Sequence, residues 1–441
     1  MTQSPIAAVV MAAGLGTRMR SAVPKHLHPL LGRRLVDWVI AAARAAGADP
    51  VVVVTSADAR GSFTGVEVAV QEQPLGTGDA VRAARAALAG FTGAVLVLNG
   101  DVPALTSDLL DELVVTHRRE GATATVLSFE PPDPGAYGRI VRDGANRLAR
   151  IVEARDASPD ELELTEVNSG IYVFDADELW PVLERLEPHN AQGELYVTDT
   201  LGFLVADGKP VAVHVAPDPL EVEGINTRAE LAAAAAFLRD RINREHMLAG
   251  VTIVDPQSAW IDAEVELDSD ATVHPFVVLR GSTRVGAGAE ILSHTVADDA
   301  EIGRGATVGP FCYLRPGTVL EADSKAGTFV EIKNSRVGQR TKVPHLSYVG
   351  DAEIGADTNL GAGAITANFP HRDGAPKGRT KIGKNVRTGI QNGFVAPVEV
   401  GDGAWTAAGS VITKDVPPEA LAIARARQEN KEGYAARHRN D

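Results

Sequence analysis

The chain has 441 residues, of which 44% are hydrophobic and 23% are charged, and these values predict a soluble globular protein of two or three domains. Its formal net charge of −15 argues against nucleic acid as a primary partner, so a phosphorylated substrate would need a local basic pocket or a metal ion. The one cysteine, Cys312, excludes an intramolecular disulfide and a cysteine-based metal cluster. Because no signal-peptide pattern and no membrane-spanning run is seen, we expect a cytoplasmic protein without membrane insertion.

The first predicted strand leads into a glycine-containing turn, within the sequence VVMAAGLGTRMRSAVPK at 9–25. Gly14 and Gly16 fit part of the dinucleotide-binding pattern, but Met19 stands where a third glycine is required. A P-loop is excluded as well, because Lys25 neither follows the last glycine directly nor precedes Ser or Thr. Small residues would still let backbone N–H groups approach an anion closely. From the two glycines alone, an ordinary strand-to-helix turn with solvated basic side chains is an equally good interpretation.

Residues 6–225 alternate short apolar runs with amphipathic helical stretches. The predicted strands lie at 7–11, 51–55, 94–101 and 171–174, and the predicted helices at 35–47 and 78–90. This alternation predicts an α/β domain with a Rossmann-like, mostly parallel sheet. Ligands of such sheets bind beyond the carboxyl ends of the strands.

A long helix is predicted next, over NTRAELAAAAAFLRDRINREHMLAG. Thr227 and Glu230 form a capping-box pattern, alanine and leucine favour the helix interior, and Gly250 ends it. A helix of about 22 residues spans roughly 33 Å. We therefore expect residues 226–250 to form a linker helix between two domains.

After this helix a single aliphatic residue recurs at every sixth position, over 251–425. Two such runs are Ile302, Val308 and Leu314, and Val337, Val343 and Val349. A period of six is typical of a hexapeptide β-helix with coils of roughly 18 residues, whereas the strands of a β-sandwich would show a period of two. The segment FPHRDGAPKGR at 369–379 interrupts the repeat and predicts a loop that leaves the coil, and such loops are often functional.

Polar residues at the end of one predicted strand indicate a metal site. Asp101 ends the strand LVLNGD, and alone it would be interpreted as a loop-capping residue. It is accompanied by Asn226 in VEGINTR, and by Glu166 and Asn168 in LTEVNSG. One Asp, one Asn and several waters suit Mg²⁺, which takes few protein oxygens. Together with Lys25 and the glycine turn, such a site indicates phosphoryl or nucleotidyl transfer.

Several longer motifs occur in a fixed order along almost the whole chain. They include AAGLGTRMRSAVPKHLHPLLGRRLVDWVI, QPLGTGDAV, LNGDVPAL, EVNSGIYVF, EVEGINTR, VGPFCYLRPG, FVEIKNS and VPHLSYVGDAEIG. These motifs resemble the bifunctional N-acetylglucosamine-1-phosphate uridylyltransferase / glucosamine-1-phosphate acetyltransferase family. The resemblance implies an α/β nucleotidyltransferase domain at 1–225, a left-handed parallel β-helix acetyltransferase domain at 251–425 and a C-terminal arm at 426–441.

For the first half, the resemblance implies Mg²⁺-dependent transfer of a uridylyl group from UTP to N-acetylglucosamine-1-phosphate, with release of pyrophosphate. It implies that Arg18 and Lys25 are catalytic and hold the phosphates, and that Asp101 and Asn226 ligate the metal. No general base is required, because a sugar phosphate is already anionic. The implied nucleotide-binding residues are Ala12, Ala13, Gly14, Gln71, Gly76 and Thr77. The implied sugar-phosphate residues are Gly138, Glu153, Asn168 and Thr198.

For the second half, the resemblance implies transfer of an acetyl group from acetyl-CoA to glucosamine-1-phosphate, within a homotrimer whose sites lie between subunits. His345 is the candidate base, because the amine must lose a proton and histidine titrates in a suitable range. A lone histidine is more often structural, but Glu331 is available to orient this one. The implied sugar-phosphate residues are Arg315, Lys333, Tyr348 and Asn359. The implied coenzyme residues are Asn368, Phe369, Lys377, Ala408 and Arg425.

The sequence departs from the family pattern on the coenzyme side of the acetyl site. Phe369 stands where a tyrosine is expected and is followed by two or three added residues, and Ile390 and Asn392 replace part of a GSDT pattern. Two other hypotheses therefore stay open. One is a sugar-1-phosphate nucleotidylyltransferase of other or broader specificity with a non-catalytic β-helix tail. The other is a regulatory scaffold, against which the intact Lys25, Asp101 and Asn226 argue.

Overall fold

The computed structural model describes residues 4–14, 16–370, 374 and 376–439, and the chain divides into two compact units, Met1–Leu238 and Arg239–Asp441. The boundary falls inside helix α7 (Arg228–Leu248), so the expected linker helix contributes residues to each unit. No helix in the described part of the chain is both long and apolar enough to cross a membrane.

A 9-stranded sheet forms the centre of the N-terminal unit, in the order β11-β7-β10-β6-β1-β4-β5, with β8 and β9 at its margin. The strands are β1 (Ile6–Ala12), β4 (Ala48–Ser56), β5 (Glu67–Gln71), β6 (Ala94–Asn99), β7 (Ala124–Phe129), β8 (Arg139–Arg142), β9 (Leu148–Val152), β10 (Val167–Asp175) and β11 (Val211–Val215). The pairs β1–β4, β1–β6, β4–β5 and β7–β11 are parallel, whereas β10 is antiparallel to both β6 and β7. The expected mostly parallel sheet is confirmed.

Helices cover both faces of this sheet, because its strands are apolar on both faces. They are α1 (Leu35–Ala45), α2 (Thr77–Ala83), α3 (Ser107–Arg119), α5 (Ala176–Leu183) and α6 (Asp199–Ala206), whereas the short α4 (Pro159–Leu162) buries none of its residues. Val10 packs in the cluster that contains residues of α1 and α3, while its neighbour Val9 packs with residues of α2, α5 and α6. This alternation along one strand is what a sheet buried on both faces requires.

Helix α2 is shorter than the predicted helix at 78–90. The backbone N–H groups of Ala84 and Arg85 bond to carbonyls three residues back, of Val81 and Arg82, and the chain continues as turns. Leu88 is nevertheless buried in the core. The apolar periodicity therefore predicted burial correctly but overestimated the length of the helix.

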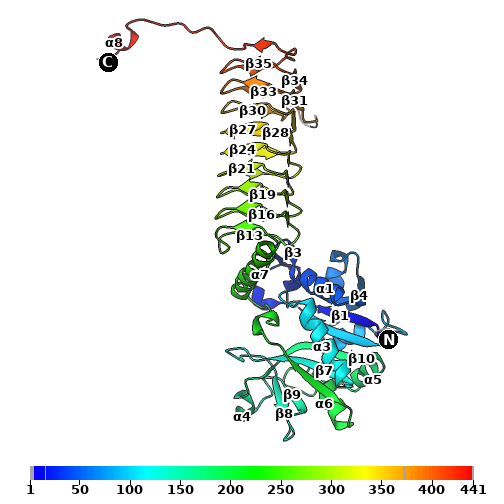
Figure 1. Cartoon of the computed structure of the whole chain (residues 1–441). Coiled ribbons are helices and arrows are strands. Elements are labelled where there is room, and N and C mark those ends of the chain that lie inside the picture. Colours follow the sequence, from blue (N-terminus) through cyan, green and yellow to red (C-terminus); the bar gives the residue numbers. More distant parts are fainter. Residues whose placement is uncertain (1–3, 15, 371–373, 375, 440–441) are drawn as a thin grey trace. The chain divides into compact units, whose positions relative to one another are not determined.

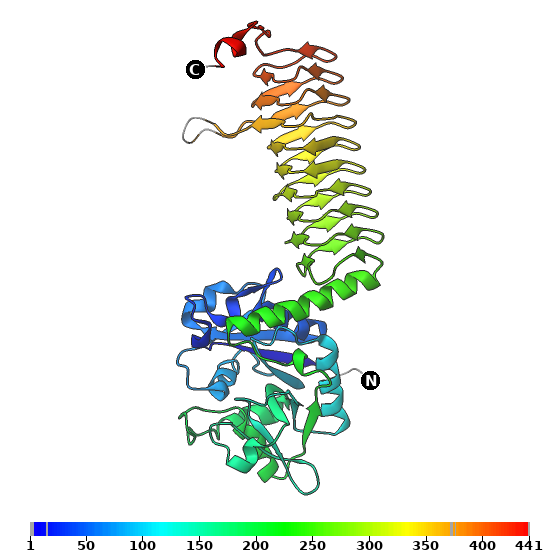
Figure 2. The same ribbon diagram turned by 90° about the vertical axis from the view of Figure 1, so that its left-hand side faces the viewer.

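In the C-terminal unit the chain winds into stacked coils with three strand faces (Figures 1 and 2). The first face holds β12 (Thr252–Ile253), β15 (Thr272–Val273), β18 (Glu290–Ile291), β21 (Thr307–Val308), β24 (Lys325–Thr328) and β27 (Lys342–His345), and later β32 (Arg387–Thr388), β35 (Trp405–Thr406) and β37 (Leu421–Ala422). The second holds β13 (Trp260–Ile261), β16 (Val278–Arg280), β19 (Val296–Asp298), β22 (Tyr313–Leu314), β25 (Glu331–Lys333), β28 (Tyr348–Gly350), β30 (Ile365–Ala367), β33 (Gly393–Val395) and β36 (Val411–Ile412). The third holds β14 (Glu266–Leu267), β17 (Arg284–Val285), β20 (Glu301–Ile302), β23 (Val319–Leu320), β26 (Arg336–Val337), β29 (Ala352–Ile354), β31 (Thr380–Ile382) and β34 (Val398–Val400).

The six-residue repeat forms the stacked coils that the sequence predicted. All strand pairs in this unit are parallel, and Thr272 pairs with Glu290, which in turn pairs with Thr307. Coils of 18 and of 17 residues therefore stack on one another without loss of register. The aliphatic residues of the repeat, such as Ile302 and Val349, are buried inside the coils. The parallel β-helix is confirmed.

The segment between β30 and β31 leaves the stack of coils, as Figure 2 shows for its described residues. The insertion that the sequence predicted at 369–379 lies here, although residues 371–373 and 375 fall outside the described residues. The next coil then resumes, because Ile365 pairs with Gly393 and Ile354 with Ile382.

One corner of the β-helix carries apolar side chains in an unfavourable backbone conformation. We call Phe276, His294, Phe311, Phe329 and Leu346 the apolar corner. Their φ angles are 61°, 59°, 53°, 56° and 49°, a region that bulky residues rarely adopt. Neighbouring rings in this series are stacked, with centroids 4.9, 4.7 and 5.4 Å apart. The four members other than His294 are 48–61% exposed, so a line of apolar groups faces outward.

We predict that Gly338→Ala destabilises the C-terminal unit. A Cβ at this position would lie 2.7 Å from the backbone nitrogen of Ala356 in the next coil, and such overpacking costs typically 1–3 kcal/mol. The melting temperature of the variant should fall. Gly393→Ala is the matched control, because its Cβ would make only ordinary contacts, at 3.7 Å and beyond, with Val411. Equal melting temperatures for the two variants would contradict the close coil-to-coil packing.

Candidate functional site

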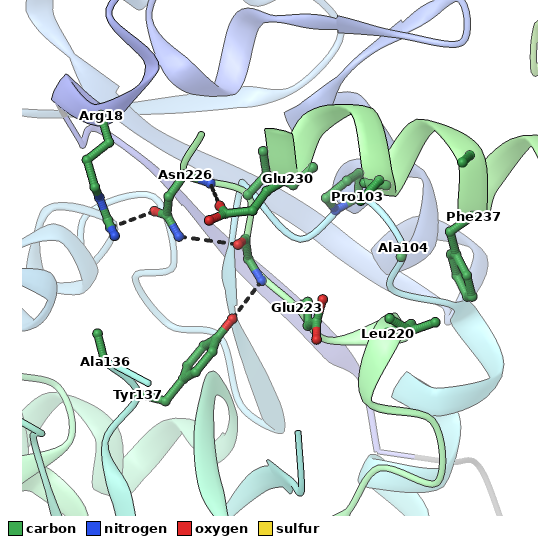
Figure 3. A pocket seen from close by; sticks show the side chains of 15 residues that line it. Arg18, Pro103, Ala104, Ala136, Tyr137, Leu220, Glu223, Asn226, Glu230 and Phe237 are labelled. Carbon is green, nitrogen blue, oxygen red and sulfur yellow. Dashed lines mark hydrogen bonds between the residues drawn. The ribbon is translucent and has the colours of Figure 1, made fainter. Parts of the chain in front are cut away.

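The Lys25 side chain joins the residues that were predicted to hold phosphates and metal. Its ammonium donates to Oδ2 of Asp101, in the loop after β6, and to Oδ1 of Asn226 at 3.0 Å. Arg18 donates from Nη2 to the same Asn226 oxygen at 2.8 Å (Figure 3). Three segments that are far apart in the sequence therefore meet at the carboxyl edge of the sheet, and they carry Arg18 with Lys25, Asp101, and Asn226.

The start of α7 holds Asn226 in place. The backbone N–H groups of Asn226 and Thr227 donate to Oε2 of Glu230 at 2.5 and 3.1 Å, and the N–H of Glu230 donates to Oγ1 of Thr227 at 3.2 Å. This is the capping box that the sequence predicted. The first turn of the helix therefore fixes the backbone on which the Asn226 amide is carried.

The donor set is compatible with a magnesium ion. Oδ2 of Asp101 and Oδ1 of Asn226 accept hydrogen bonds from one ammonium, so the two oxygens converge on a common point. In the described residues, no group of three or more His, Cys, Asp or Glu side chains could hold a metal ion. One carboxylate and one amide oxygen, completed by water and substrate phosphate, are what Mg²⁺ accepts.

A cavity of about 410 Å³ lies beside Lys25 and Asp101. The residues predicted to bind the nucleotide all line it, namely Ala12, Ala13, Gly14, Gln71, Gly76 and Thr77. Gln71 donates from its amide to the carbonyl of Gly76 at 3.0 Å and to Asp79 at 2.9 Å, which leaves its side-chain carbonyl to accept from a ligand. Gly76 must be glycine, because its φ is 120° and a Cβ would lie 2.5 Å from the carbonyl oxygen of Leu195.

The cavity also contains residues that sequence reasoning missed, among them His26 and Asn99. His26 is 4% exposed, stacks on Phe63 with ring centroids 6.0 Å apart, and has no hydrogen-bond partner for Nε2 among the described residues. Burial, and then the positive charge of Arg34, lower the pKa of His26 to about 4. A neutral imidazole therefore forms part of the wall. Its position directly after Lys25 was the signal that could have indicated it.

The residues predicted to bind the sugar phosphate form a second group beside this cavity. The N–H of Asn168 donates to the carbonyl of Gly138 at 2.8 Å, and Oγ1 of Thr198 donates to Glu153 at 3.4 Å. A Cβ on Gly138 would lie 3.4 Å from both carboxylate oxygens of Glu153. The group adjoins the cavity because the N–H of Val197 donates to Oγ1 of Thr77 at 3.0 Å.

Glu153 is the carboxylate in this group. Burial raises its pKa above the ordinary value of 4.5, and the charges of Asp199 and Asp156 raise it further, although the hydrogen bond from Thr198 opposes them. In the described residues no cation pairs with it. An unpaired half-buried carboxylate is a strong acceptor for the hydroxyl groups of a sugar.

In the C-terminal unit, three of the predicted sugar-phosphate residues lie on one face. Arg315 follows β22, Lys333 ends β25 and Tyr348 begins β28, on successive coils of the second face. The ammonium of Lys377 lies close to that of Lys333 and lowers the pKa of Lys333. Asn359 lies on the first face instead, where its backbone pairs with Lys342.

His345 ends β27 and is exposed. The expected contact with Glu331 is not formed, because the Glu331 carboxylate accepts from Nη1 of Arg315 at 2.8 Å. No described residue hydrogen-bonds to the His345 imidazole. An orienting carboxylate for this histidine therefore has to come from elsewhere.

The predicted coenzyme residues are spread over three segments: Asn368, Phe369 and Lys377 lie between β30 and β31, Ala408 lies in the turn between β35 and β36, and Arg425 follows β37. Asn368 is 8% exposed and donates to Asp351, whereas Phe369 is 75% exposed. Ala408 is exposed, and a Cβ on Gly409 beside it would lie 3.8 Å from Cδ of Arg425. Asn392 is buried and donates to the carbonyls of Ala407 and Ser410 at 2.9 and 3.3 Å, so it supports the coil rather than a ligand.

Comparison with known proteins extends this picture to the whole chain. Residues 8–164 match the family described as MobA-like NTP transferase domain. The chain is 48% identical to the protein named "Bifunctional protein GlmU" of Streptomyces avermitilis, over 99% of this chain and 95% of that protein. It is 44% identical to the protein of the same name from Trichlorobacter lovleyi, over 99% of each. The similarity therefore includes both units.

We predict that Glu153→Gln raises stability near neutral pH. Folding raises the pKa of the Glu153 carboxyl, so the ionised form of this side chain lowers the free energy of unfolding. This loss of stability is complete above the folded-state pKa and is absent below the ordinary value of 4.5, where the carboxyl is protonated in both states. The melting temperature of the variant should exceed that of the parent at pH 7, and the difference should close as the pH falls through the raised pKa. Glu163→Gln, at an exposed position, is the control and should be neutral. A pH-independent difference would show that burial of the charge is not the cause.

Proposed function

The chain belongs to the GlmU family of bifunctional proteins, and on this premise we propose that its two units catalyse two successive group transfers. The C-terminal unit moves an acetyl group from acetyl-CoA to glucosamine-1-phosphate. The N-terminal unit moves a uridylyl group from UTP to N-acetylglucosamine-1-phosphate and releases pyrophosphate. The observation that carries the proposal is the meeting of Lys25, Asp101 and Asn226 beside a cavity, in a chain that matches bifunctional relatives over 99% of its length.

In the uridylyl transfer, the protein positions two anions against each other. An oxygen of the sugar phosphate attacks the α-phosphorus of UTP, the bond from that phosphorus to the bridging oxygen breaks, and pyrophosphate leaves with the electron pair. Lys25 and Arg18 provide positive charge where charge is redistributed, which is the main catalytic requirement of such reactions. Asp101 and Asn226 would hold Mg²⁺, which supplies further neutralisation of the phosphates when bound.

The residues around Glu153, beside the nucleotide cavity, position the sugar. Glu153 accepts hydrogen bonds from its hydroxyl or amide groups, while Thr198 holds the carboxylate through its Oγ1. Gly138 leaves room for the sugar, because a side chain there would meet Glu153. The nucleotide lies in the adjoining cavity, with its base near Gln71 and Gly76.

In the acetyl transfer, His345 accepts a proton from the amine as the nitrogen attacks the thioester carbonyl. The carbon–nitrogen bond forms, the carbon–sulfur bond breaks, and the proton passes to the departing thiolate. Arg315 and Lys333 attract the sugar phosphate, and Lys377 beside Lys333 adds a third positive charge. Coenzyme A lies against the last coils, near Asn368 and Ala408.

A homotrimer would complete this second site. His345 is exposed in the single chain, so a neighbouring copy is needed to exclude water and to provide an orienting partner. The apolar corner supports such an assembly, because its last member, Leu346, directly follows His345 and is 61% exposed. Contiguous exposed apolar groups of this kind mark protein interfaces. A second copy of the chain is the partner that we propose.

A second candidate function is nucleotidyl transfer alone, with a non-catalytic β-helix. It is favoured by one observation, that Glu331 pairs with Arg315 and leaves His345 without a carboxylate in the single chain. The discriminating assay supplies glucosamine-1-phosphate, acetyl-CoA, UTP and Mg²⁺, and measures free thiol and pyrophosphate separately. Pyrophosphate release with supplied N-acetylglucosamine-1-phosphate, but no thiol release, would support this alternative.

We predict that the two activities are separable by single substitutions. His345→Ala should lower thiol release about 100- to 10,000-fold, because it removes the base, and should leave uridylyl transfer to supplied N-acetylglucosamine-1-phosphate intact. Lys25→Ala should lower pyrophosphate release about 100- to 1,000-fold, because it removes charge from the phosphates, and should spare thiol release.

His189→Ala and Lys414→Ala are the matched controls, since both positions are exposed and lie outside these sites. Melting temperatures are measured for all four variants. If His345→Ala melts as the parent does and still acetylates at the parent rate, the acetyl-transfer assignment is wrong.

Metal dependence should be confined to one activity. We expect EDTA to stop pyrophosphate release, because two protein oxygens bind an ion only weakly without substrate. Thiol release should continue, since no cation is required by the residues around His345. A parallel loss of both activities would argue against the proposed metal ligands Asp101 and Asn226.

We predict that the apolar corner controls assembly. The double variant Phe311→Ser, Phe329→Ser should sediment as a smaller species than the parent, because two stacked, exposed rings are lost from the interface. It should lose thiol release but keep pyrophosphate release. Val115→Ser, which removes an exposed apolar side chain from the N-terminal unit, is the control. A parent protein that sediments as a monomer and acetylates normally would contradict the trimer.

A further inference from the structure

The Gln71 side chain, at the end of β5, lines the nucleotide cavity, and the orientation of its amide decides which group it offers to a ligand. Its Nε2 donates to the carbonyl of Gly76 at 3.0 Å and to Oδ2 of Asp79 at 2.9 Å. A backbone carbonyl and an ionised carboxylate can only accept hydrogen bonds. If the amide were rotated by half a turn, its oxygen would lie against two acceptors. The contacts therefore specify one orientation of the amide.

The segment that carries the two acceptors is itself held in place. The N–H of Gly78 donates to the carbonyl of Leu195 at 2.8 Å. The N–H of Ala80 donates to the Gly76 carbonyl at 3.2 Å, which is the first hydrogen bond of α2, and Asp79 lies in the first turn of this helix. The Gly76 carbonyl therefore cannot turn away from Gln71 without breaking the start of α2.

The other end of the Gln71 amide is available to a ligand. Its side-chain oxygen accepts no hydrogen bond from any described residue, although the residue is only 8% exposed. An acceptor that is largely shielded from water lowers stability until a donor pairs with it. The cavity wall thus presents a fixed hydrogen-bond acceptor.

A fixed acceptor distinguishes two bases of nearly equal size. Uracil carries an N–H group at position 3, between two carbonyls, whereas cytosine carries a lone pair at the same position, next to an amino group. An acceptor opposite position 3 attracts the N–H group of uracil and repels the lone pair of cytosine. A site that is built to accept from a substrate N–H group discriminates strongly against an analogue that lacks this group.

We propose that Asp79 is a positioning residue that sets the nucleobase preference of the N-terminal unit, because it holds the Gln71 oxygen toward the base. This inference rests on the function proposed above, in which the base lies near Gln71. Asp79 does not line the cavity, so it acts through Gln71. Its contribution exceeds that of Gly76, because a hydrogen bond to a charged acceptor is about twice as strong as one to a neutral acceptor.

The first test is Asp79→Asn, which keeps the shape of the side chain and adds a donor. The new amide can donate to a rotated Gln71, so both orientations become accessible. We expect the ratio of kcat/KM for UTP to that for CTP, measured by pyrophosphate release, to fall about tenfold, the effect of one hydrogen bond to a charged group. Preference for UTP should not vanish, because the Gly76 carbonyl still opposes rotation.

Two further variants define this effect. Asp79→Ala removes the acceptor without adding a donor, and it should lower the ratio less than Asp79→Asn does. Asp108→Asn is the matched control, because it makes the same change at an exposed position in the first turn of α3, and the ratio should stay at the parent value. Equal ratios in the parent and in both Asp79 variants would overturn the proposal.

A third nucleotide separates reorientation of Gln71 from a loosened cavity. N3-methyl-UTP has neither an N–H group nor a lone pair at position 3, so neither orientation of Gln71 accommodates it. In Asp79→Asn the use of CTP should improve relative to UTP, and the use of N3-methyl-UTP should not. An equal improvement for both nucleotides would show that the cavity has only become less selective, and the proposal would be wrong.

A double-mutant cycle tests whether Asp79 acts through Gln71. In a Gln71→Leu background, Asp79→Asn should leave the ratio of UTP to CTP use unchanged, because there is no amide left to orient. A tenfold change in that background would contradict the positioning role. Melting temperatures of the single and double variants show that the proteins compared are folded.

Calorimetry on the full chain with Mg²⁺ and either UTP or CTP, without sugar phosphate, separates this inference from the proposed function. A parent that prefers UTP in binding but releases no pyrophosphate would refute the proposed function, while the affinity ratio in Asp79→Asn would still decide the role of Asp79. A parent that binds both nucleotides equally would overturn the inference itself.

Discussion

The hydrogen bonds from the Lys25 ammonium to Asp101 and Asn226 are the contacts on which the N-terminal unit depends. They join the turn after β1, the loop after β6 and the segment before α7, and the two side chains of the Lys25–Asp101 pair are only 15% and 21% exposed. When one partner of a salt bridge this well shielded from solvent is lost, the folded protein is strongly destabilised, because the other charge stays buried without a partner. One cation thus holds together the two predicted metal oxygens and forms part of the wall of the nucleotide cavity.

Parallel strands explain why so many polar residues gather there. The carboxyl ends of β1, β5 and β6 lie at one edge of the sheet, so the turns that follow them converge. Buried and half-buried polar groups accumulate at this edge, among them the neutral His26 and Glu153, a carboxylate that pairs with no described cation. Each lowers the stability of the free protein, and each is the kind of group that a polar ligand would satisfy.

The C-terminal unit is built under a different constraint. Its interior is filled by aliphatic residues of the repeat, such as Ile302 and Val349, so no ligand can enter between the faces. Its chemistry has to lie on the outside, where Arg315, Lys333 and His345 are carried by turns and strand ends. An external site needs a cover to exclude water, and this links the proposed acetyl transfer to assembly. The positive φ angles of the apolar corner are consistent with a surface selected for such contact.

The sequence by itself determined the features that depend on local pattern. The six-residue period specified the β-helix, the alternation of apolar runs specified the α/β unit, and Thr227 with Glu230 specified the start of α7, because each pattern dictates burial or hydrogen bonding within a few residues. The tertiary structure alone decided which distant side chains meet. It paired Glu331 with Arg315 instead of His345, and it placed Asn359 on another face than Tyr348. These outcomes depend on how loops and coils approach one another in space, which no periodicity along the chain encodes.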